Sequence, residues 1–377
     1  MNELQDCILG DLVEFQRGYD LPKDSFVKGE YPVQSSNGIL GYHNEYKVKA
    51  PGITIGRSGT VGIPHLITKN FFPHNTALYV KDFKGNNVHY IYYLLKNLKL
   101  NEYKTGSGVP TMNRNHLHPL KIKAFTDSKH QKSIAAVLSA LDKKIALNKQ
   151  INARLEEMVK TLYDYWFVQF DFPDTNGKPY KSSGGEMVFD ETLKREIPKG
   201  WEVKSLGEIA TLKAGGDKPE LISRFQTQEY KFPIYSNGLN DNALYGYCKK
   251  AIITEPSITI SARGTIGFTK IRNHSFTPII RLISVTPKNS QFIKFLELFL
   301  SQTSFENAGS VQKQLTIPQI ENIKILTPNI KLINKFSDIT TLSVGLIESN
   351  EKQNHQLTQL RDFLLPMLMN GQVSVAE

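Results

Sequence analysis

The chain has 377 residues, of which 40% are hydrophobic and 22% charged, so it is long enough for two or more globular domains. Its formal net charge of +10 favours a polyanionic partner, nucleic acid first, over a merely solvated lysine-rich surface. Cys7 and Cys248 form no CxxC pair, which argues against a zinc ribbon or a disulfide framework. The N-terminal segment is not a secretory signal and no run of about 18 apolar residues exists, so we expect a cytoplasmic protein without a membrane span.

Residues 1–126 are expected to form a first mixed α/β domain. Short β-rich runs such as ITIG at residues 53–56 are separated by Gly, Pro and Asn, a pattern typical of strands and tight turns. The string NNVHYIYYLLKNLKL at residues 86–100 has the periodicity of an amphipathic helix. The polar string TGSGVPTMN follows at residues 105–113 and predicts a loop.

The amino-acid composition then changes: residues 128–168 contain neither Gly nor Pro. Their apolar positions recur every three or four residues, which predicts a long coiled-coil helix over residues 127–169. Residues 170–200 are rich in Gly, Pro, Ser and charge and are expected to be a linker. We expect this linker to carry the chain back along the helix.

The second half of the chain repeats the first. The string YPVQSSNG at residues 31–38 returns as FPIYSNG at 232–238, and PGITIGRSGTVG at 51–62 returns as PSITISARGTIG at 256–267. Several such matches in the same order indicate an internal duplication. The expected fold is therefore α+β, with a second mixed α/β domain at residues 201–327 and a second long helix at residues 328–377.

Both predicted helices place two asparagines on the apolar seam. These are Asn148 and Asn152 in the first helix, and Asn350 and Asn354 in the second. Buried Asn in a coiled coil is best known for fixing register and partner. We expect the helices to pair antiparallel about a pseudo-twofold axis, with Asn148 against Asn354 and Asn152 against Asn350. The alternative is that the asparagines lie at exposed edges of two unrelated helices.

Sites for catalysis are not evident. The sequence has no GxxxxGK[ST] string for ATP and no methyltransferase motif pair. The three EYK strings lack the upstream Pro-Asp that a PD-(D/E)xK nuclease requires, since the only Pro-Asp lies in the linker. The pair His116 and His118 has no third ligand nearby and is expected at the surface rather than on a metal, so we expect neither catalytic nor metal-binding residues.

Two similar basic domains suit a DNA duplex with two half-sites, one read by each domain. Glycines in the repeated loop allow a tight turn whose backbone approaches a phosphate, and Arg57 or Arg263 can reach a base edge or a phosphate. The alternative for each residue is a plain β-turn that packs against its neighbour. The candidate DNA-binding residues are Ser36, Asn37, Arg57, Ser58, Thr60, Lys104, Ser107, Thr111, Asn113, Arg114, Ser236, Asn237, Arg263, Thr265, Ser310, Gln312, Lys313 and Gln314.

Three strings resemble a known family. LRDFLLPMLMNGQV at residues 360–373 is similar to the C-terminal signature of specificity (S) subunits of type I restriction–modification enzymes. IPKGWEVKSLGEI at residues 197–209 and ILGDLVEF at 8–15 are similar to the usual opening of that family's target-recognition domains. The resemblance covers the whole chain, in the order recognition domain, helix, recognition domain, helix.

The resemblance implies a non-catalytic subunit that binds double-stranded DNA with a bipartite, asymmetric target. It also implies two adenine methyltransferase (modification) subunits and nuclease/translocase (restriction) subunits as partners, with AdoMet, ATP and Mg²⁺ bound by those partners and no cofactor on this chain. The alternatives are a standalone repressor-like DNA-binding protein, for which no helix-turn-helix is visible, and a nuclease, for which no site is visible.

Overall fold

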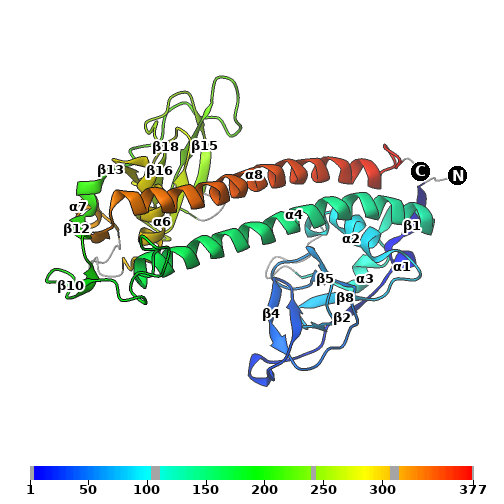
Figure 1. The fold of residues 1–377 in the computed structure, drawn as a ribbon. Helices are drawn as coiled ribbons and strands as arrows, with labels where there is room; N and C mark the ends of the chain where they lie inside the picture. The colour runs from blue at the N-terminus through cyan, green and yellow to red at the C-terminus, as the bar shows by residue number, and fades with distance from the viewer. Residues whose placement is uncertain (1–3, 103–110, 239–242, 306–313, 376–377) are drawn as a thin grey trace. The chain divides into compact units, whose positions relative to one another are not determined.

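The computed structural model describes residues 4–102, 111–238, 243–305 and 314–375. The chain forms two compact units. Unit 1 comprises Met1–Gln150 and Asn350–Glu377, and unit 2 comprises Ile151–Ser349. The long helices α4 (Ser128–Tyr163) and α8 (Ile330–Met369) each contribute one part to unit 1 and one part to unit 2 (Figure 1).

Unit 1 is built on small sheets, which are antiparallel except for the parallel pairing of β3 with β7. A four-stranded sheet has the order β2-β8-β5-β6, a three-stranded sheet has the order β4-β3-β7, and β1 pairs with β9. The strands are β1 (Gln5–Ile8), β2 (Glu14–Arg17), β3 (Tyr31–Ser35), β4 (Gly38–His43), β5 (Gly52–Gly56), β6 (Pro64–Ile67), β7 (Phe72–Pro73), β8 (Ala77–Asp82) and β9 (Lys121–Ala124). The helices are α1 (Leu9–Leu12), α2 (Val88–Asn97) and α3 (Arg114–Leu117), with 3-10 turns at Lys23–Ser25 and Leu100–Glu102.

The core of unit 1 lies between the four-stranded sheet and the helices. Ile53 and Ile55 of β5, two residues apart on one face of the strand, are buried together with Tyr90 and Leu94, four residues apart on one face of α2. The same core includes side chains from both long helices, which are Ile134 and Leu138 of α4 and Leu365, Leu368 and Met369 of α8. The four-stranded sheet is therefore fixed directly to the helix pair.

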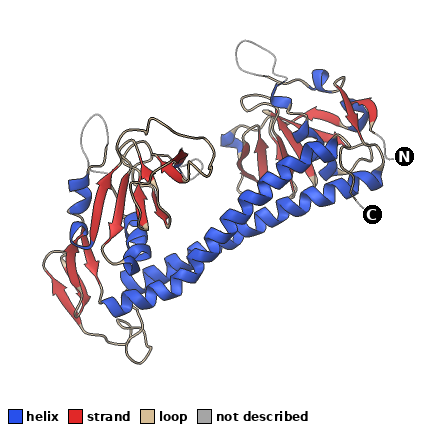
Figure 2. Ribbon diagram, turned by 90° about the horizontal axis from the view of Figure 1, so that it is seen from above, coloured by secondary structure: helices blue, strands red, loops and turns tan. Residues whose placement is uncertain are grey.

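Unit 2 repeats this topology. Its sheets have the orders β13-β19-β16-β17, β15-β14-β18 and β12-β20, and the hairpin β10-β11 is additional. The strands are β10 (Met187–Asp190), β11 (Arg195–Pro198), β12 (Glu202–Ser205), β13 (Ala210–Ala214), β14 (Phe232–Tyr235), β15 (Leu244–Cys248), β16 (Ser257–Ile260), β17 (Thr269–Arg272), β18 (Thr277–Pro278), β19 (Ile283–Pro287) and β20 (Lys324–Thr327). The helices are α5 (Leu206–Ile209), α6 (Ile293–Gln302) and α7 (Ile317–Glu321), with a 3-10 turn at Ser290–Phe292. Figure 2 shows strands and helices of each unit as separate layers.

The expected duplication is thus present as two mixed domains with the same strand order. Within each unit α4 and α8 run antiparallel. In unit 1 Asp142 pairs with Arg361 and Asn148 with the earlier residue Asn354. In unit 2 Asn152 contacts Ile347, and Tyr163 packs on the earlier residue Phe336. The first long helix was expected to extend over residues 127–169. It is α-helical to Tyr163 and continues as a π-helix over Asp164–Val168, whose Trp166 and Phe167 enter the core of unit 2.

The expectation that residues 170–200 carry the chain back along the helix is wrong. Phe172 stacks on Trp201, with ring centroids 5.2 Å apart, and Phe170 packs edge-on against the same indole. The hairpin β10-β11 follows. Because these aromatic rings are buried in the core of unit 2, the segment folds as part of that unit.

Candidate functional site

Four loops meet in each unit. In unit 1 these are residues 35–37, 57–63, 74–76 and 111–113, which we call loop cluster 1. The Ser36 N–H donates to Oγ1 of Thr76 (3.3 Å), and the Arg57 N–H donates to the Thr76 carbonyl (2.8 Å). The Met112 N–H donates to the Arg57 carbonyl (2.9 Å). Hydrogen bonds therefore join the four loops into a single surface.

The corresponding loops of unit 2 are residues 236–238, 262–267, 279–281 and 314–316, which we call loop cluster 2. The Gly62 N–H donates to the Gly56 carbonyl (3.0 Å) in unit 1, and the Gly267 N–H donates to the Ser261 carbonyl (2.9 Å) in unit 2. The Leu315 N–H donates to the Ala262 carbonyl (3.1 Å), as Met112 does to Arg57. The backbone of the repeated string follows the same path in both units.

The repeated glycines have a conformational reason. Gly59 and Gly62 have φ of 82° and 81°, and their counterparts Gly264 and Gly267 have φ of 68° and 85°. This left-handed region is open to glycine and costly for other residues. A Cβ on Gly62 would also lie 2.3 Å from the Asn101 backbone nitrogen. The glycines therefore make the turn, whatever the turn contacts.

Asn237 links two loops of cluster 2. Its Oδ1 accepts the Ala262 N–H (2.8 Å), and its Nδ2 donates to the Ile280 carbonyl (2.6 Å). Asn37, which matches Asn237 in the repeated SNG string, is exposed in unit 1, and the direct bond from the Arg57 N–H to the Thr76 carbonyl joins the loops there. Asn237 therefore has a structural task that its sequence context alone does not show.

The two arginines of the repeated loops are not equivalent. The shared backbone pattern aligns Arg57 with Ala262, so Arg263 corresponds to Ser58. Arg57 is half-buried, and its guanidinium donates to the Asn75 carbonyl at 3.4 Å. Arg263 is exposed, and its Nε and an Nη both donate to Oε1 of Gln314, at 3.1 and 2.7 Å. Arg263 therefore does not occupy in unit 2 the backbone position that Arg57 occupies in unit 1.

Loop cluster 2 contains a strained turn that the sequence did not indicate. Ile280 and Arg281 have φ of 52° and 62°, the left-handed region that a β-branched residue rarely adopts. Such residues cost about 1–3 kcal/mol each and persist only where the surroundings hold them. Here the carbonyls of Gly216 and Gly215 accept the N–H groups of Ile280 (2.8 Å) and Arg281 (3.1 Å). Arg281 is exposed at this turn.

The other predicted DNA-binding residues are distributed as follows. Ser36 is buried, and Asn113 caps α3 by accepting the Asn115 N–H (3.0 Å). Ser58 bridges to Thr111 between two loops of cluster 1. Residues with at least partly accessible side chains are Asn37, Ser58, Thr60, Thr111, Asn113, Arg114, Ser236, Thr265 and Gln314. The predicted residues Lys104, Ser107, Ser310, Gln312 and Lys313 lie outside the described residues.

The asparagine seam differs between the units. In unit 1 the fully buried Asn148 donates through Nδ2 to Oδ1 of Asn354 (3.0 Å) and to Oε1 of Gln353 (2.7 Å). In unit 2 Asn152 donates to the Ile347 carbonyl (3.3 Å) across the seam. Among the described residues, Oδ1 of Asn148 is buried without a partner. A buried polar atom of this kind lowers stability and favours one helix register over others.

A second polar contact fastens the helices of unit 1. Asp142 of α4 accepts the hydroxyl of Tyr93 from α2 (2.7 Å) and pairs with Arg361 of α8 (2.8 Å). Burial, together with the adjacent Asp142 carboxylate, raises the pKa of Tyr93 well above its ordinary value. Sequence reasoning missed this cluster, because its three residues come from three separate helices.

The two histidines at residues 116–118 have separate environments. His118 stacks on Phe15, and its Nε2 accepts the Phe15 N–H (2.9 Å). Burial, helped by the nearby cations Arg114 and Lys84, lowers the pKa of His118. His116 is exposed. His118 therefore acts as a neutral hydrogen-bond acceptor within the fold.

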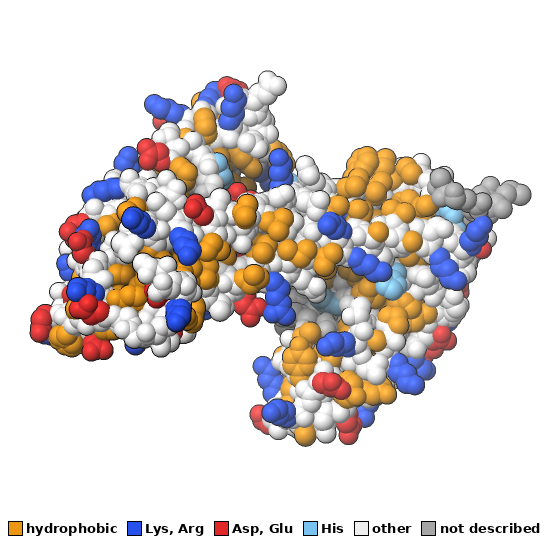
Figure 3. Space-filling model, viewed as in Figure 1, with side chains coloured by type: hydrophobic (Ala, Val, Ile, Leu, Met, Phe, Trp, Pro, Cys, Tyr) orange, Lys and Arg blue, Asp and Glu red, His pale blue; other side chains and the backbone are white. Residues whose placement is uncertain are grey.

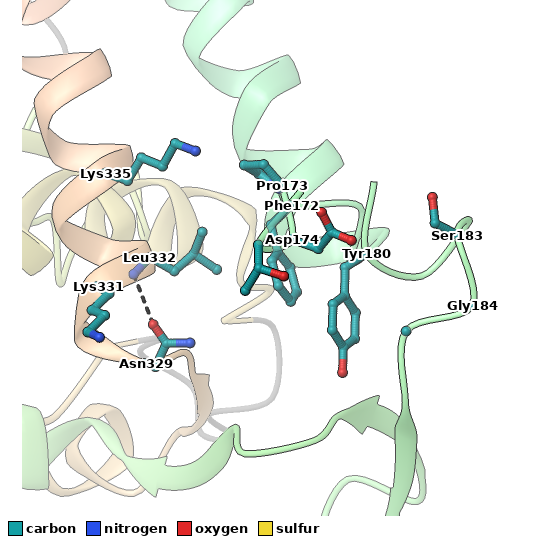
Figure 4. A pocket seen from close by; sticks show the side chains of 12 residues that line it. Phe172, Pro173, Asp174, Tyr180, Ser183, Gly184, Asn329, Lys331, Leu332 and Lys335 are labelled. Carbon is teal, nitrogen blue, oxygen red and sulfur yellow. Dashed lines mark hydrogen bonds between the residues drawn. The ribbon is translucent and has the colours of Figure 1, made fainter. Parts of the chain in front are cut away.

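An open pocket of about 540 Å³ lies beside the linker in unit 2 (Figure 4). Phe172 and Tyr180, stacked 4.6 Å apart, line it together with Lys331 and Lys335 from the start of α8. Asp174, also in the lining, accepts the N–H groups of Asn176 and Lys178 through one oxygen (2.8 Å each). Its carboxylate is thus used to hold the linker turn.

The exposed surface carries both charged and hydrophobic side chains. Lys and Arg side chains are scattered over the surface of both units on the face shown in Figure 3. Hydrophobic side chains also reach the surface of the long helices. In unit 1 these include Leu147, Leu360 and Phe363, and in unit 2 Met158, Ile339, Leu342 and Leu346. None of the described helices combines the length and apolar character needed to cross a membrane.

Comparison with known proteins places these features in a family. The model for the type I restriction modification DNA specificity domain matches residues 1–157 and 198–359. The specificity subunit of type I restriction enzyme MjaIX from Methanocaldococcus jannaschii is 30% identical over 311 residues, covering 76% of this chain and 69% of that protein. The HindI specificity subunit of Haemophilus influenzae is 25% identical over 313 residues, covering 66% and 68%.

A solved structure shares the fold. The crystal structure of the type I restriction–modification S subunit from M. genitalium superposes with a TM-score of 0.63 at 19% identity, over 97% of this chain and 96% of that one. The match of the family model to both halves coincides with the two units that carry the loop clusters. The chain belongs to the family of DNA specificity subunits of type I restriction–modification systems.

Proposed function

We propose that this chain reads a bipartite, asymmetric DNA sequence, with one loop cluster for each half-site. The observation that carries the proposal is the duplicated loop backbone with different side chains. The bonds Gly62 to Gly56 and Gly267 to Ser261 are the same, whereas Arg57 corresponds to Ala262. Equal scaffolds with unequal side chains suit two half-sites of different sequence.

The candidate contacts fall into two kinds. Accessible Arg57 and Arg114 in unit 1, and Arg263 in unit 2, supply guanidinium groups for base edges or phosphates. Accessible Asn, Ser and Thr side chains of the same loops supply shorter polar contacts. Ser36 and Asn237 have another task, because one is buried and the other holds two loops together. We therefore assign these two to positioning.

The long helices are the proposed scaffold for partner subunits. Ile339, Leu342 and Leu346 lie on α8 of unit 2 with 47%, 81% and 48% of their surface exposed. Residues at this spacing share one helix face. An exposed apolar stripe of this kind is typical of a surface that a partner covers. We propose two methyltransferase subunits and the nuclease/translocase subunits as those partners.

In this proposal the chain performs no chemistry of its own and works in the cytoplasm. AdoMet, ATP and Mg²⁺ would bind to the partner subunits. The experiment compares the purified chain alone with the chain plus its methyltransferase subunits, using AdoMet and plasmid DNA. We expect adenine methylation at a two-part sequence from the complex, and neither methylation nor cleavage from the chain alone. Cleavage or methylation by the chain alone would contradict the proposal.

A further inference from the structure

We infer that Arg281 is a specificity-determining residue for the second half-site and is the functional counterpart of Arg57. This inference rests on the proposed function. Arg281 lies outside the repeated string, and the argument compares equivalent backbone positions in the two loop clusters.

The equivalence follows from the backbone. In unit 1 the Ala77 N–H donates to the His74 carbonyl (2.9 Å), and in unit 2 the Leu282 N–H donates to the Ile279 carbonyl (3.0 Å). The His74 N–H also donates to the Gln34 carbonyl of β3 (2.8 Å), just as the Ile279 N–H donates to the Tyr235 carbonyl of β14 (2.9 Å). Position 76 of unit 1 therefore corresponds to position 281 of unit 2.

The positions that carry arginine are neighbours within each cluster. In unit 1 the Arg57 N–H is bonded to the Thr76 carbonyl. In unit 2 the side chain of Asn237 bridges Ala262 and Ile280. Ala262 is the residue that corresponds to Arg57, and Ile280 directly precedes Arg281, which corresponds to Thr76. Unit 1 thus has Arg57 opposite Thr76, and unit 2 has Ala262 opposite Arg281. The arginine of unit 2 is thus carried by the other of the two neighbouring loops.

Arg281 is also the arginine of cluster 2 whose head group is available. It is exposed, and within the described part of the chain no hydrogen bond or ion pair engages its guanidinium. The guanidinium of Arg263, in contrast, is bonded to Gln314 by two N–H groups. A free guanidinium is the group that recognises the O6 and N7 acceptors of a guanine by two parallel hydrogen bonds.

The turn that carries Arg281 is rigid. Both Ile280 and Arg281 occupy the left-handed region, and their N–H groups are held by the carbonyls of Gly216 and Gly215. A Cβ on Gly215 would lie 2.6 Å from the Pro278 carbonyl carbon, so the two segments are in close contact. A strained, firmly held turn with an exposed arginine is the kind of position where strain serves a binding function.

The test uses the complex of the full chain with its methyltransferase subunits. Arg281→Asn removes the guanidinium and retains a residue that tolerates a positive φ. Binding of the cognate duplex and of duplexes with single base-pair changes is measured over a salt series. We expect the variant to lose about tenfold or more in discrimination at one position of the second half-site. Discrimination in the first half-site should stay unchanged.

Three controls make the result specific. Arg281→Gly checks that the loss of the guanidinium, and not the new asparagine side chain, decides the outcome, and thermal unfolding checks that both variants fold. Lys331→Ala removes an exposed charge of unit 2 outside the loop cluster and should leave discrimination unchanged. Arg57→Ala should give the mirror result, a loss confined to the first half-site.

Two results would overturn the inference. One is unchanged discrimination in Arg281→Asn. The other is a uniform loss of affinity for all sequences with a reduced salt dependence, which would make Arg281 a phosphate contact. A wild-type complex that recognises no two-part sequence would instead overturn the proposed function, so the two failures can be distinguished.

Discussion

In loop clusters 1 and 2 the repeated string follows the same backbone path, but the string is joined to its neighbouring loop in different ways. In unit 1 a direct bond between the Arg57 N–H and the Thr76 carbonyl joins two loops, whereas in unit 2 the side chain of Asn237 joins them. The arginine positions differ as well, since the residue of unit 2 that corresponds to Arg57 is Ala262. Similar strings in a duplicated chain therefore indicate a common backbone, and the residues that contact a ligand must be assigned separately in each unit.

The layer between the two sheets differs in the same way. In unit 2 the buried Arg272 lies 3.7 Å from the centroid of the Tyr235 ring and donates through Nε to Oγ1 of Thr259 (3.2 Å). The equivalent residues of unit 1 are Ile67 and Thr54. Oγ1 of Thr54 is fully buried and has no partner among the described residues. The duplicated fold thus tolerates a charged layer in one copy and an unsatisfied hydroxyl in the other.

The largest effect is expected at the start of the repeated loop. A Cβ on Gly56 would lie 1.7 Å from the Thr60 carbonyl oxygen, although the equivalent position of unit 2 already holds Ser261. We expect Gly56→Val to lower the free energy of unfolding by about 3 kcal/mol, since backbone must move. Ser261→Gly should cost about 1 kcal/mol or less. Denaturant unfolding of both variants measures the difference, and equal losses would show that the two loops are not distinct here.

The inter-sheet layer offers a matched pair of substitutions. Thr259→Val removes the acceptor of the buried Arg272, so we expect a loss of about 2 kcal/mol in the free energy of unfolding. Thr54→Val replaces an unpartnered hydroxyl by a methyl group of similar shape and should be neutral or stabilising. Thermal and denaturant unfolding test both. A larger loss from Thr54→Val than from Thr259→Val would contradict this comparison.

Asn237 and Asn37 test the loop assignment. We expect Asn237→Ala to cost about 1.5 kcal/mol of stability, because it removes two hydrogen bonds that join loops. Asn37→Ala should leave stability nearly unchanged, because Asn37 is exposed. If Asn37 contacts DNA, its variant weakens binding without altering unfolding. Equal stability of the two variants would remove the distinction between a positioning and a contact residue.

A smaller effect is expected from pH. The lowered pKa of His118 means that the folded chain binds a proton less readily there than the unfolded chain. The stability that neutral His118 provides is therefore complete above its ordinary pKa and is lost as the pH falls. His118→Gln keeps an acceptor for the Phe15 N–H and does not titrate. Between pH 7.5 and 5.5 the wild type should lose more thermal stability than this variant. Identical losses would show that His118 does not contribute to the pH dependence of stability.

Much of the architecture could be predicted from the sequence, because it depends on patterns. The duplication, the mixed domains and the antiparallel long helices follow from repeated strings and a heptad period. The hydrogen bond from Asn148 to Asn354 joins two residues that the heptad period places on the apolar faces of their respective helices. The turn glycines were visible because positive φ strongly selects glycine.

Other features depend on contacts that a local pattern does not encode. The strained Ile280–Arg281 turn has no sequence signature, because β-branched residues are not expected there. The Asp142 cluster requires three helices to be placed first. The Gly and Pro content of residues 170–200 predicts an extended linker, whereas the burial of Phe170 and Phe172 against Trp201 depends on contacts with the rest of unit 2.

The most direct test of the central claim, one unit for one half-site, exchanges a single domain. Residues 1–125 are replaced by the equivalent domain of a relative with a different target, and the methylated sequence of the resulting complex is mapped across genomic DNA. The account predicts that one half of the recognised sequence changes and the other half is retained. A change in both halves, or in neither, would contradict it.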